Sequence, residues 1–184
     1  MLIIGITGTS GAGKGTIATY LVKQYGFKHL SVRDFIVKEI KRRGMEVNRD
    51  SMIDTANDLR YNHGAEYIVM ELYKEALESN KNCIIESIRS VGEVEALQKQ
   101  KVFVLWGVDA SIEERYSRAV KRNGSTDIVS FEEFKQQETR ETTSTDKSKQ
   151  NITECLKMAD IVFNNNGSIK DLKKQIDREI KSLL

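Results

Sequence analysis

The sequence of 184 residues predicts an α/β protein of three layers, with helices on both faces of a five-stranded parallel sheet. Three observations predict this fold class. Short apolar runs alternate along the chain with longer amphipathic segments, and a glycine-rich stretch joins the first run to the first amphipathic segment. The apolar runs also lack the polar alternation of half-exposed strands. A strand followed by a helix, repeated several times, is typical of a parallel sheet that is covered on both faces.

Five apolar runs are expected to form the strands, at residues 2–6, 28–31, 83–87, 102–108 and 161–164. The amphipathic segments between them are expected to be helical, at residues 15–25, 35–42, 51–80, 91–99, 112–122 and 169–184. We expect the segment 51–80 to form two helices that break near His63 and Gly64, because glycine often ends a helix. This order of elements predicts a single domain over residues 1–184.

The composition predicts a cytoplasmic protein without a nucleic-acid or membrane partner. Lys and Arg number 29 against 27 Asp and Glu, a net charge of +2, which is too balanced for a surface that binds nucleic acid through bulk charge. No apolar run approaches the roughly 18 residues of a membrane span. The two cysteines, Cys83 and Cys155, are expected to be reduced and to pack as small apolar residues.

The composition changes once, in the polar stretch 123–150. A polar insertion of this length in a compact domain is usually either disordered or a functional lid. We predict a lid, in which Arg140 is a candidate to close onto a bound anion.

A phosphate-binding loop is predicted directly after the first strand. Its sequence is GTSGAGKGT, formed by Gly8, Thr9, Ser10, Gly11, Ala12, Gly13, Lys14, Gly15 and Thr16. Glycines let the backbone curl so that several N–H groups face one anion, the following helix start adds positive charge, and Lys14 supplies a point charge. Gly15 stands where many such loops place a hydroxyl that binds Mg²⁺, so we expect Mg²⁺ to be held through water and nucleotide oxygens, with Thr16 as the nearest hydroxyl.

Four further segments accompany this loop, and together they resemble the nucleoside monophosphate kinases. The adenylate kinases of that group share the G-x-x-G-x-G-K-G-T spelling, and the other segments are HLSVRD (29–34), IIESIRS (84–90), ERYSRAVKR (114–122) and ADIVFNNNGSIKDL (159–172). The last segment is also similar to the dephospho-CoA kinases. The resemblance spans nearly the whole chain, although only the phosphate-binding loop is specific by itself.

This resemblance implies a P-loop NTPase fold with a lid insertion and an ATP-dependent kinase that uses ATP and Mg²⁺. It implies that Arg118 stacks on adenine, that Arg122 contacts the ATP phosphates, and that Asn166 and Gly167 lie along the adenine pocket. Residues 33–80 would form the helices that bind the acceptor. The chain departs from adenylate kinases at Val37, where those enzymes have an arginine, and so the acceptor is not simply AMP.

Phosphoryl transfer needs positive charge around the migrating group more than it needs covalent chemistry. The candidate catalytic residues are therefore Lys14, Arg89, Arg118 and Arg122. Arg115, Arg118 and Arg122 recur at helical spacing, which fits either a solvated basic stripe or a phosphate-binding face. The candidate acceptor-binding residues are Arg33, Asp34, Arg60 and Arg89.

Glu86 ends the third strand, at the edge where parallel sheets bind ligands, and it is expected either to orient Mg²⁺-bound water or to be a hydrogen-bonded structural carboxylate. Asp34 is expected to orient the acceptor or to cap the next helix. His29 and His63 lack a partner pattern and are expected to pack.

Three functions fit these features. The leading hypothesis is a kinase that transfers the γ-phosphoryl group of ATP to a small acceptor, a nucleoside or deoxynucleoside monophosphate. The first alternative is a dephospho-CoA kinase, whose hydroxyl acceptor needs a general base such as Asp34. The second is a regulatory nucleotide-binding ATPase, whose lid would bind a partner. The predicted helices within 33–80 favour a kinase, because a minimal switch does not need them.

Overall fold

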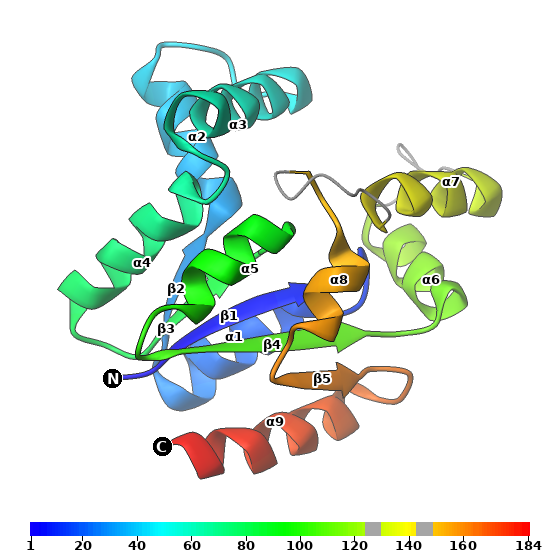
Figure 1. The fold of residues 1–184 in the computed structure, drawn as a ribbon. Helices are drawn as coiled ribbons and strands as arrows, with labels where there is room; N and C mark the ends of the chain where they lie inside the picture. The colour runs from blue at the N-terminus through cyan, green and yellow to red at the C-terminus, as the bar shows by residue number, and fades with distance from the viewer. Residues whose placement is uncertain (124–129, 143–148) are drawn as a thin grey trace.

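The computed structural model describes residues 1–123, 130–142 and 149–184. Its five strands form one parallel sheet in the order β2-β3-β1-β4-β5, as Figure 1 shows. The strands are β1 (Ile3–Gly8), β2 (Lys28–Ser31), β3 (Cys83–Glu86), β4 (Phe103–Asp109) and β5 (Ile161–Asn164). Helices cover both faces of this sheet, which confirms the predicted three-layer α/β/α fold.

Nine helices lie in the described residues, and five of them are on one side of the sheet. That side carries α2 (Val32–Arg42), α3 (Arg49–His63), α4 (Tyr67–Ser79), α5 (Val91–Gln98) and α8 (Ile152–Lys157), which contribute to one apolar cluster. The opposite side carries α1 (Lys14–Tyr25) and α9 (Ile169–Leu183), which contribute to the second cluster. The remaining helices are α6 (Ile112–Asn123), which follows β4, and α7 (Phe131–Thr142), beside it in Figure 1.

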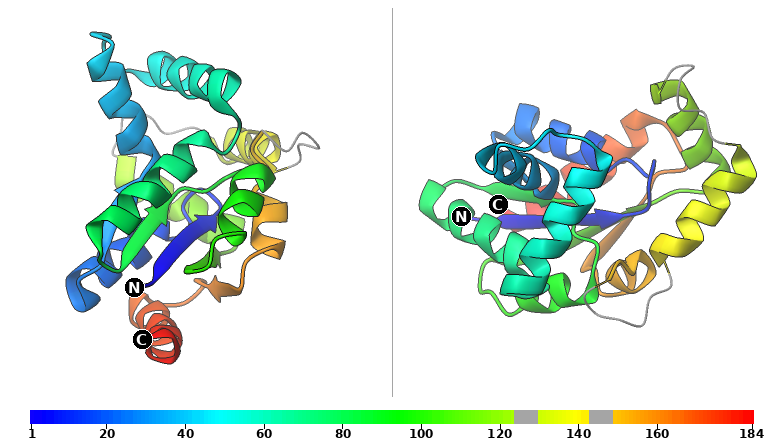
Figure 2. Two further views of the ribbon diagram at one scale, coloured as in Figure 1. Left: turned by 60° about the vertical axis from the view of Figure 1, so that its left-hand side comes forward. Right: turned by 90° about the horizontal axis from the view of Figure 1, so that it is seen from above.

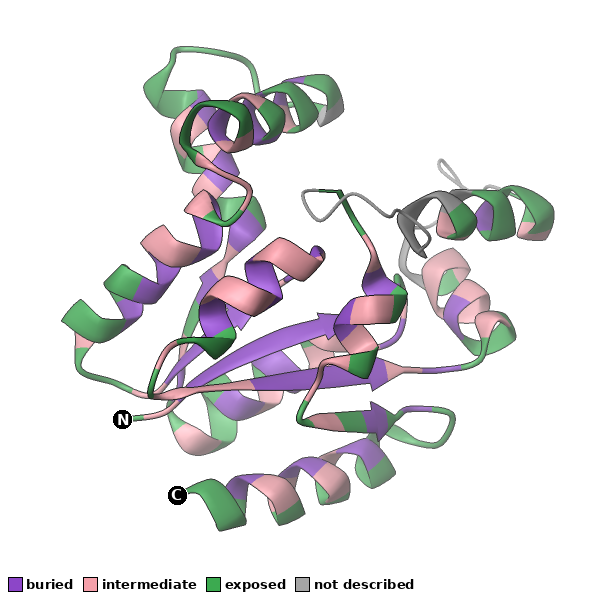
Figure 3. Ribbon diagram, viewed as in Figure 1, coloured by how far each residue is buried: buried purple, intermediate pink, exposed green. Residues whose placement is uncertain are grey.

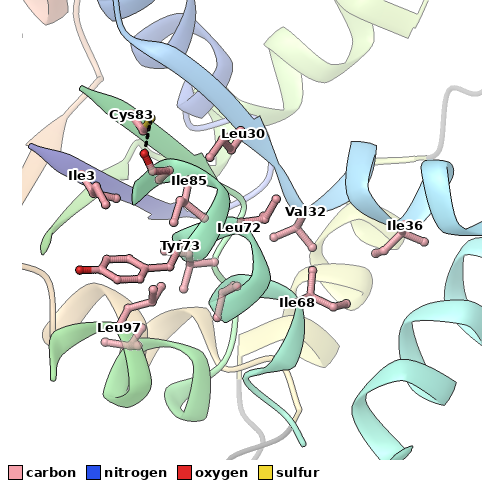
Figure 4. Packing of buried hydrophobic residues seen from close by; sticks show 14 of the residues in the cluster. Ile3, Leu30, Val32, Ile36, Ile68, Leu72, Tyr73, Cys83, Ile85 and Leu97 are labelled. Carbon is pink, nitrogen blue, oxygen red and sulfur yellow. Dashed lines mark hydrogen bonds between the residues drawn. The ribbon is translucent and has the colours of Figure 1, made fainter. Parts of the chain in front are cut away.

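The two clusters follow from the alternation of side chains along buried strands. Ile3 belongs to the cluster beside α4 and α5, whereas its neighbour Ile4 belongs to the cluster beside α1 and α9, because successive strand residues point to opposite faces. The central strand β1 is accordingly buried along its whole length, as are the inner faces of the helices, whereas the edge strands β2 and β5 each include at least one exposed residue (Figure 3). Figure 4 shows part of the cluster that contains Ile3, including Tyr73 of α4 and Leu97 of α5.

Helices α2 and α3 extend beyond the end of β2, as Figure 1 and the left view of Figure 2 show. Helix α2 begins at Val32, three residues before the predicted start, because the Ser31 hydroxyl accepts a hydrogen bond from the backbone N–H of Asp34 and caps the helix. Asp34 therefore lies in the first turn and is not the cap. The predicted break near Gly64 is confirmed, since α3 ends at His63.

Two helices were not among the predicted elements. Helix α7 lies within the polar stretch 123–150, and α8 lies between that stretch and β5. In the described part of the chain, no helix has both the length and the apolar character needed to cross a membrane.

Candidate active site

The predicted phosphate-binding loop lies between the end of β1 and the start of α1. Gly8, Gly11 and Gly13 have φ values of 147°, 78° and 117°, in the left-handed region that favours glycine. A Cβ on Gly8 would lie 2.2 Å from the backbone oxygen of Val108, so this strand end also has no room for a side chain. Among the described residues, no side chain caps the start of α1. The loop therefore presents a helix N-terminus that is open to an anion.

Lys14 bends back over this loop. Its Nζ atom donates to the carbonyl oxygens of Gly8, at 2.8 Å, and Thr9, at 2.9 Å. The ammonium group is therefore held at the mouth of the loop, where an incoming phosphate oxygen would compete for its protons.

Thr9 and Asp109 connect the loop to the end of β4. The Thr9 hydroxyl donates to Asp109 Oδ1 at 2.6 Å, and Asp109 Oδ1 also accepts from the backbone N–H of Ala110 at 2.9 Å. The helix that follows β4 receives its side-chain cap from Ser111, whose hydroxyl accepts from the Glu114 N–H. Asp109 thus supports the loop, a role that its position after the strand did not reveal.

Arg115 lies beneath the loop and differs from the other arginines of α6. Its side chain is only 6% exposed; Nη1 donates to the Ser10 carbonyl at 3.4 Å, and Nε donates to the Ala110 carbonyl at 2.8 Å. Its Nη2 forms an ion pair with Glu138 of α7 at 2.5 Å. Arg115 therefore joins the loop to α7, a role that differs from both predictions made from its helical spacing, a solvated basic stripe and a phosphate-binding face.

Asn165 supports the loop from the other side. It follows β5, is 6% exposed, and its Nδ2 atom donates to the Ala12 carbonyl at 2.7 Å. Its backbone N–H donates to the Asp109 carbonyl at 2.8 Å, and its own carbonyl accepts from Arg118 Nη2 at 2.7 Å. The second Arg118 nitrogen, Nη1, is buried and has no hydrogen-bond partner within the described chain.

A cavity of about 1010 Å³ opens in front of the loop. It brings together several of the predicted site residues, namely Gly11, Gly13, Lys14, Gly15, Thr16, Glu86, Arg118 and Gly167. Its basic lining residues are Lys14, Lys23, Arg118, Lys121 and Lys173, against the acidic Glu86 and Glu114. This excess of positive charge suits a polyphosphate.

Asn166, which the family resemblance placed along the adenine pocket, is not among the described residues that line the cavity. It is exposed, and its Oδ1 atom accepts from the Ser111 N–H at 2.6 Å. The buried neighbour Asn165 lines the cavity instead. The side chains of Arg122 and Arg140, both predicted to contact phosphates, lie outside the described residues.

Glu86, the last residue of β3, forms a pair with His29, the second residue of the neighbouring strand β2. His29 Nε2 lies 2.7 Å from Glu86 Oε2, and this contact raises the pKa of His29 above its usual value, with a smaller contribution from the charge of Asp34. The prediction that His29 only packs was wrong, because two adjacent strands bring it to a carboxylate. The other oxygen, Glu86 Oε1, points toward the start of α1, 3.9 Å from where a Cβ of Gly15 would be.

Arg60 and Arg89, two predicted acceptor ligands, meet at Glu93. Arg60 Nη2 lies 3.3 Å from Glu93 Oε1, and Glu93 Oε2 accepts from the backbone N–H groups of Arg89 and Ser90 at 2.9 and 3.1 Å. Glu93 is 1% exposed. Arg89 also reaches across to Gln150, with Nη1 at 3.3 Å from its Oε1 atom.

The other two predicted acceptor ligands, Arg33 and Asp34, are exposed in the first turn of α2. None of the four predicted acceptor ligands lines the cavity in front of the loop. The four residues therefore lie outside the basic cavity, Arg60 and Arg89 at Glu93 and Arg33 and Asp34 at the start of α2.

Asn165 and Glu93 were not among the predicted site residues. For Glu93 a signal was present, since Ser90 and Glu93 have the S-x-x-E spacing of a capping box, which the structure contains. Asn165 lay in a turn-like NNNG sequence, and nothing in that pattern distinguished it from its neighbours.

Comparison with known proteins shows two kinds of similarity. A family described as an AAA domain matches residues 7–135. A UPF0200 protein of Methanocaldococcus jannaschii is 33% identical over 187 residues, covering 100% of this chain and 91% of that protein. A UPF0200 protein of Pyrobaculum aerophilum is 30% identical over 184 residues, covering 98% of each.

Solved structures share the fold at lower identity. TT1252 from Thermus thermophilus has a TM-score of 0.67 at 21% identity and covers 100% of this chain and 98% of its own. Dephospho-CoA kinase from Campylobacter jejuni has a TM-score of 0.60 at 16% identity, covering 98% and 96%. A shikimate kinase from Bacteroides thetaiotaomicron has a TM-score of 0.57 at 14% identity, covering 99% and 98%. These similarities establish a P-loop kinase-like fold.

Proposed function

The chain belongs to the AAA domain family and to the UPF0200 family, and from this premise we propose that it is an ATP-dependent phosphotransferase. It would transfer the γ-phosphoryl group of ATP to a small acceptor, most simply a nucleoside or deoxynucleoside monophosphate. The observation that carries this proposal is the loop from Gly8 to Thr16, which starts α1 without a side-chain cap and opens into a basic cavity.

Each part of the cavity has a proposed role toward ATP. The loop amides and Lys14 would bind the phosphates, and Lys14 would release its bonds to the loop carbonyls as it does so. The unpartnered Nη1 of Arg118 would gain an acceptor, and its guanidinium plane would lie against the adenine. Gly167 would form the neighbouring wall, as part of the loop that carries Asn165.

A Mg²⁺ ion bound with the nucleotide would neutralise part of the phosphate charge. The residues present fit an ion that keeps most of its water, because Glu86 and Thr16 line the cavity with oxygen donors. Across the described residues, no group of three or more His, Cys, Asp or Glu side chains is placed to hold a metal ion directly. Glu86, fixed by His29, would then orient a water molecule.

In the transfer itself, the bond between the γ-phosphorus and its bridging oxygen breaks, and the electron pair leaves with ADP. An acceptor oxygen forms the new bond to phosphorus. A phosphate acceptor brings no proton that must be removed, so no general base is required. Lys14, Arg89 and Arg118, with Arg122 as a further candidate, would neutralise the charge of the migrating group.

We place the acceptor outside the basic cavity, with Arg33, Asp34, Arg60 and Arg89 as the residues that would bind it. Residues 33–80 would be the acceptor-binding part of the chain, since they include the three helices α2 to α4. Residues 123–150 would form a lid, of which α7 is connected to the phosphate-binding loop through Arg115 and Glu138. Lid closure would exclude water and so suppress hydrolysis of ATP.

A dephospho-CoA kinase is the second candidate, and the position of Asp34 favours it. Asp34 lies close enough to the His29–Glu86 pair to help raise the pKa of His29, so a carboxylate is present near the end of the sheet as a general base for a hydroxyl acceptor. The resemblance of residues 159–167, ADIVFNNNG, to the dephospho-CoA kinases is weaker support. Asp160 in this stretch has a structural role, because Oδ2 accepts from the Leu105 N–H at 2.7 Å.

The test is to incubate the protein with ATP and Mg²⁺ and a panel of acceptors: nucleoside monophosphates, deoxynucleoside monophosphates, dephospho-CoA, shikimate and simple sugars. ADP formation that depends on one acceptor supports a kinase and identifies its class. Asp34→Asn separates the two candidates, since it should abolish transfer to a hydroxyl but spare much of the transfer to a phosphate. Hydrolysis that no acceptor accelerates would instead indicate a regulatory ATPase.

A further inference from the structure

Asn165 is a buried polar residue in a loop that is distant in sequence from the phosphate-binding loop. The two positions that its amide connects, 12 and 165, are separated by 153 residues. A buried amide needs hydrogen-bond partners, because an unpaired polar group in the interior destabilises the fold. The Nδ2 atom of Asn165 donates a hydrogen bond of 2.7 Å to the carbonyl oxygen of Ala12, inside the phosphate-binding loop.

The packing around this bond is close. A Cβ built on Gly13 would lie 2.5 Å from Asn165 Nδ2, so the absence of a side chain at position 13 is what lets the amide approach the loop. Gly13 also has a φ of 117°, which an L-residue rarely adopts. Gly13 and Asn165 therefore fit together as a matched pair.

The bond to Ala12 has a consequence for the next N–H group. Ala12 C=O and Gly13 N–H belong to one peptide unit, and in a planar trans peptide these two groups point in opposite directions. Because the Asn165 amide holds the carbonyl on its own side, the Gly13 N–H is directed away from Asn165. Gly13 is also the N-cap of α1, so its N–H lies at the positive end of the helix.

We propose that Asn165 is a positioning residue that fixes the Ala12–Gly13 peptide so that the Gly13 N–H is presented to a phosphate of the bound nucleotide. This inference rests on the proposed function and deepens it, since it concerns the same cavity. Asn165 acts through the loop backbone. Its carbonyl separately holds Arg118 Nη2 at 2.7 Å, and that contact does not involve the side chain.

Three variants test the proposal. Asn165→Ala removes the amide, whereas Asn165→Asp keeps its shape but replaces the donor with an acceptor that repels the Ala12 carbonyl. Asn164→Asp is the control for charge. Asn164 is exposed, and its Oδ1 atom already accepts from the Asn166 N–H at 3.0 Å, which an aspartate also does.

Calorimetry gives the Kd for ADP with Mg²⁺, which depends on the phosphate contacts. Calorimetry with adenosine gives the Kd for a ligand that has no phosphate. We expect the Kd for ADP to rise about tenfold in Asn165→Ala and about a hundredfold in Asn165→Asp, where a negative charge is added. The Kd for adenosine should stay within about twofold, since it has no phosphate. In a spectrum of protein labelled with ¹⁵N-glycine, the Gly13 signal should shift in both variants without ligand and should not shift in Asn164→Asp.

Each result has a distinct meaning. Wild-type protein that takes up neither ADP nor ATP would defeat the proposed function itself. Wild-type protein that binds ADP, with Asn165→Ala binding it equally well, would leave the function standing and overturn this inference. Equal weakening of ADP and adenosine would also overturn it, because Asn165 would then only support the pocket as a whole.

Discussion

The guanidinium group of Arg60 lies 3.3 Å from the carboxylate of Glu93, which is 1% exposed. The same carboxylate accepts the backbone N–H groups of Arg89 and Ser90, so one buried charge fixes both a helix start and an arginine from a distant helix. Arg60 and Arg89, which we propose bind the acceptor, are thereby both held by the Glu93 carboxylate.

Glu93→Ala should lower the free energy of unfolding by about 2 kcal/mol, because it leaves two N–H groups and the Arg60 side chain without their shared acceptor. Glu93→Gln keeps one acceptor oxygen and should cost about half as much. Urea unfolding measures both. The exposed Glu78→Ala should change stability by less than about 0.5 kcal/mol. An effect of Glu93→Ala no larger than that of Glu78→Ala would contradict this role.

Gly8→Ala should abolish measurable ADP binding and also destabilise the fold, since the new Cβ would lie 2.2 Å from a backbone oxygen of β4. Gly26→Ala is the matched control. Gly26 also has a positive φ, of 71°, but nothing lies within 4 Å of its Cβ position. It should cost only about 1 kcal/mol of backbone strain and leave the Kd for ADP unchanged. Equal nucleotide affinity in the two variants would be the adverse outcome.

Arg118→Ala should raise the KM for ATP about tenfold or more, because it removes a guanidinium that lines the cavity and whose buried Nη1 atom has no hydrogen-bond partner among the described residues. Arg118→Lys should recover only part of this loss, since an ammonium group lacks the planar fork. Steady-state kinetics at saturating acceptor give the KM. Arg178→Ala removes the same charge from an exposed position of α9 and should leave the KM as it is.

The stability of helix α2 should depend on pH through Glu39. Hydrogen bonds from Arg42 and Arg43 lower the pKa of Glu39 to about 2, from an ordinary value of 4.5. A carboxyl group with a lowered folded-state pKa contributes stability that is complete above its unfolded pKa and is lost as the pH falls through the folded value. The relevant window therefore runs from about pH 4.5 down to about pH 2.

Glu39→Gln should thus be less stable than the wild type at pH 7 by about 1 kcal/mol or less, because solvent screens the exposed arginines. Urea unfolding at pH 7, 4 and 3 should show this difference shrinking as the pH falls. A difference that is the same at all three pH values would show that the ion pairs do not cause it.

The features that could be predicted from the sequence are those that depend on residues close together along the chain. The loop from Gly8 to Thr16 depends on local glycines and one lysine, and the strands depend on short apolar runs, so both followed from the order of residues alone. The predicted start of α2 was three residues too late. Asp34 and Ser31 can both cap a helix, and in the structure Ser31 is the cap.

Contacts between distant segments could not be predicted in the same way. His29 and Glu86 meet only because β2 and β3 are neighbours in the sheet, in a register that pairs Ser31 with Glu86. Asn165 reaches the phosphate-binding loop because β5 ends beside β4. The sequence contains the residues for such pairs, but the strand order that joins them appears only in the folded chain.

The central claim is that the loop between β1 and α1 binds the phosphates of a nucleotide, and isothermal calorimetry with ATP and Mg²⁺ tests it most directly. We predict saturable binding to the wild-type protein and a Kd at least about tenfold weaker for Lys14→Ala, which should remain as folded as the wild type by circular dichroism. Absence of ATP binding to the wild-type protein, or equal binding by Lys14→Ala, would contradict the account.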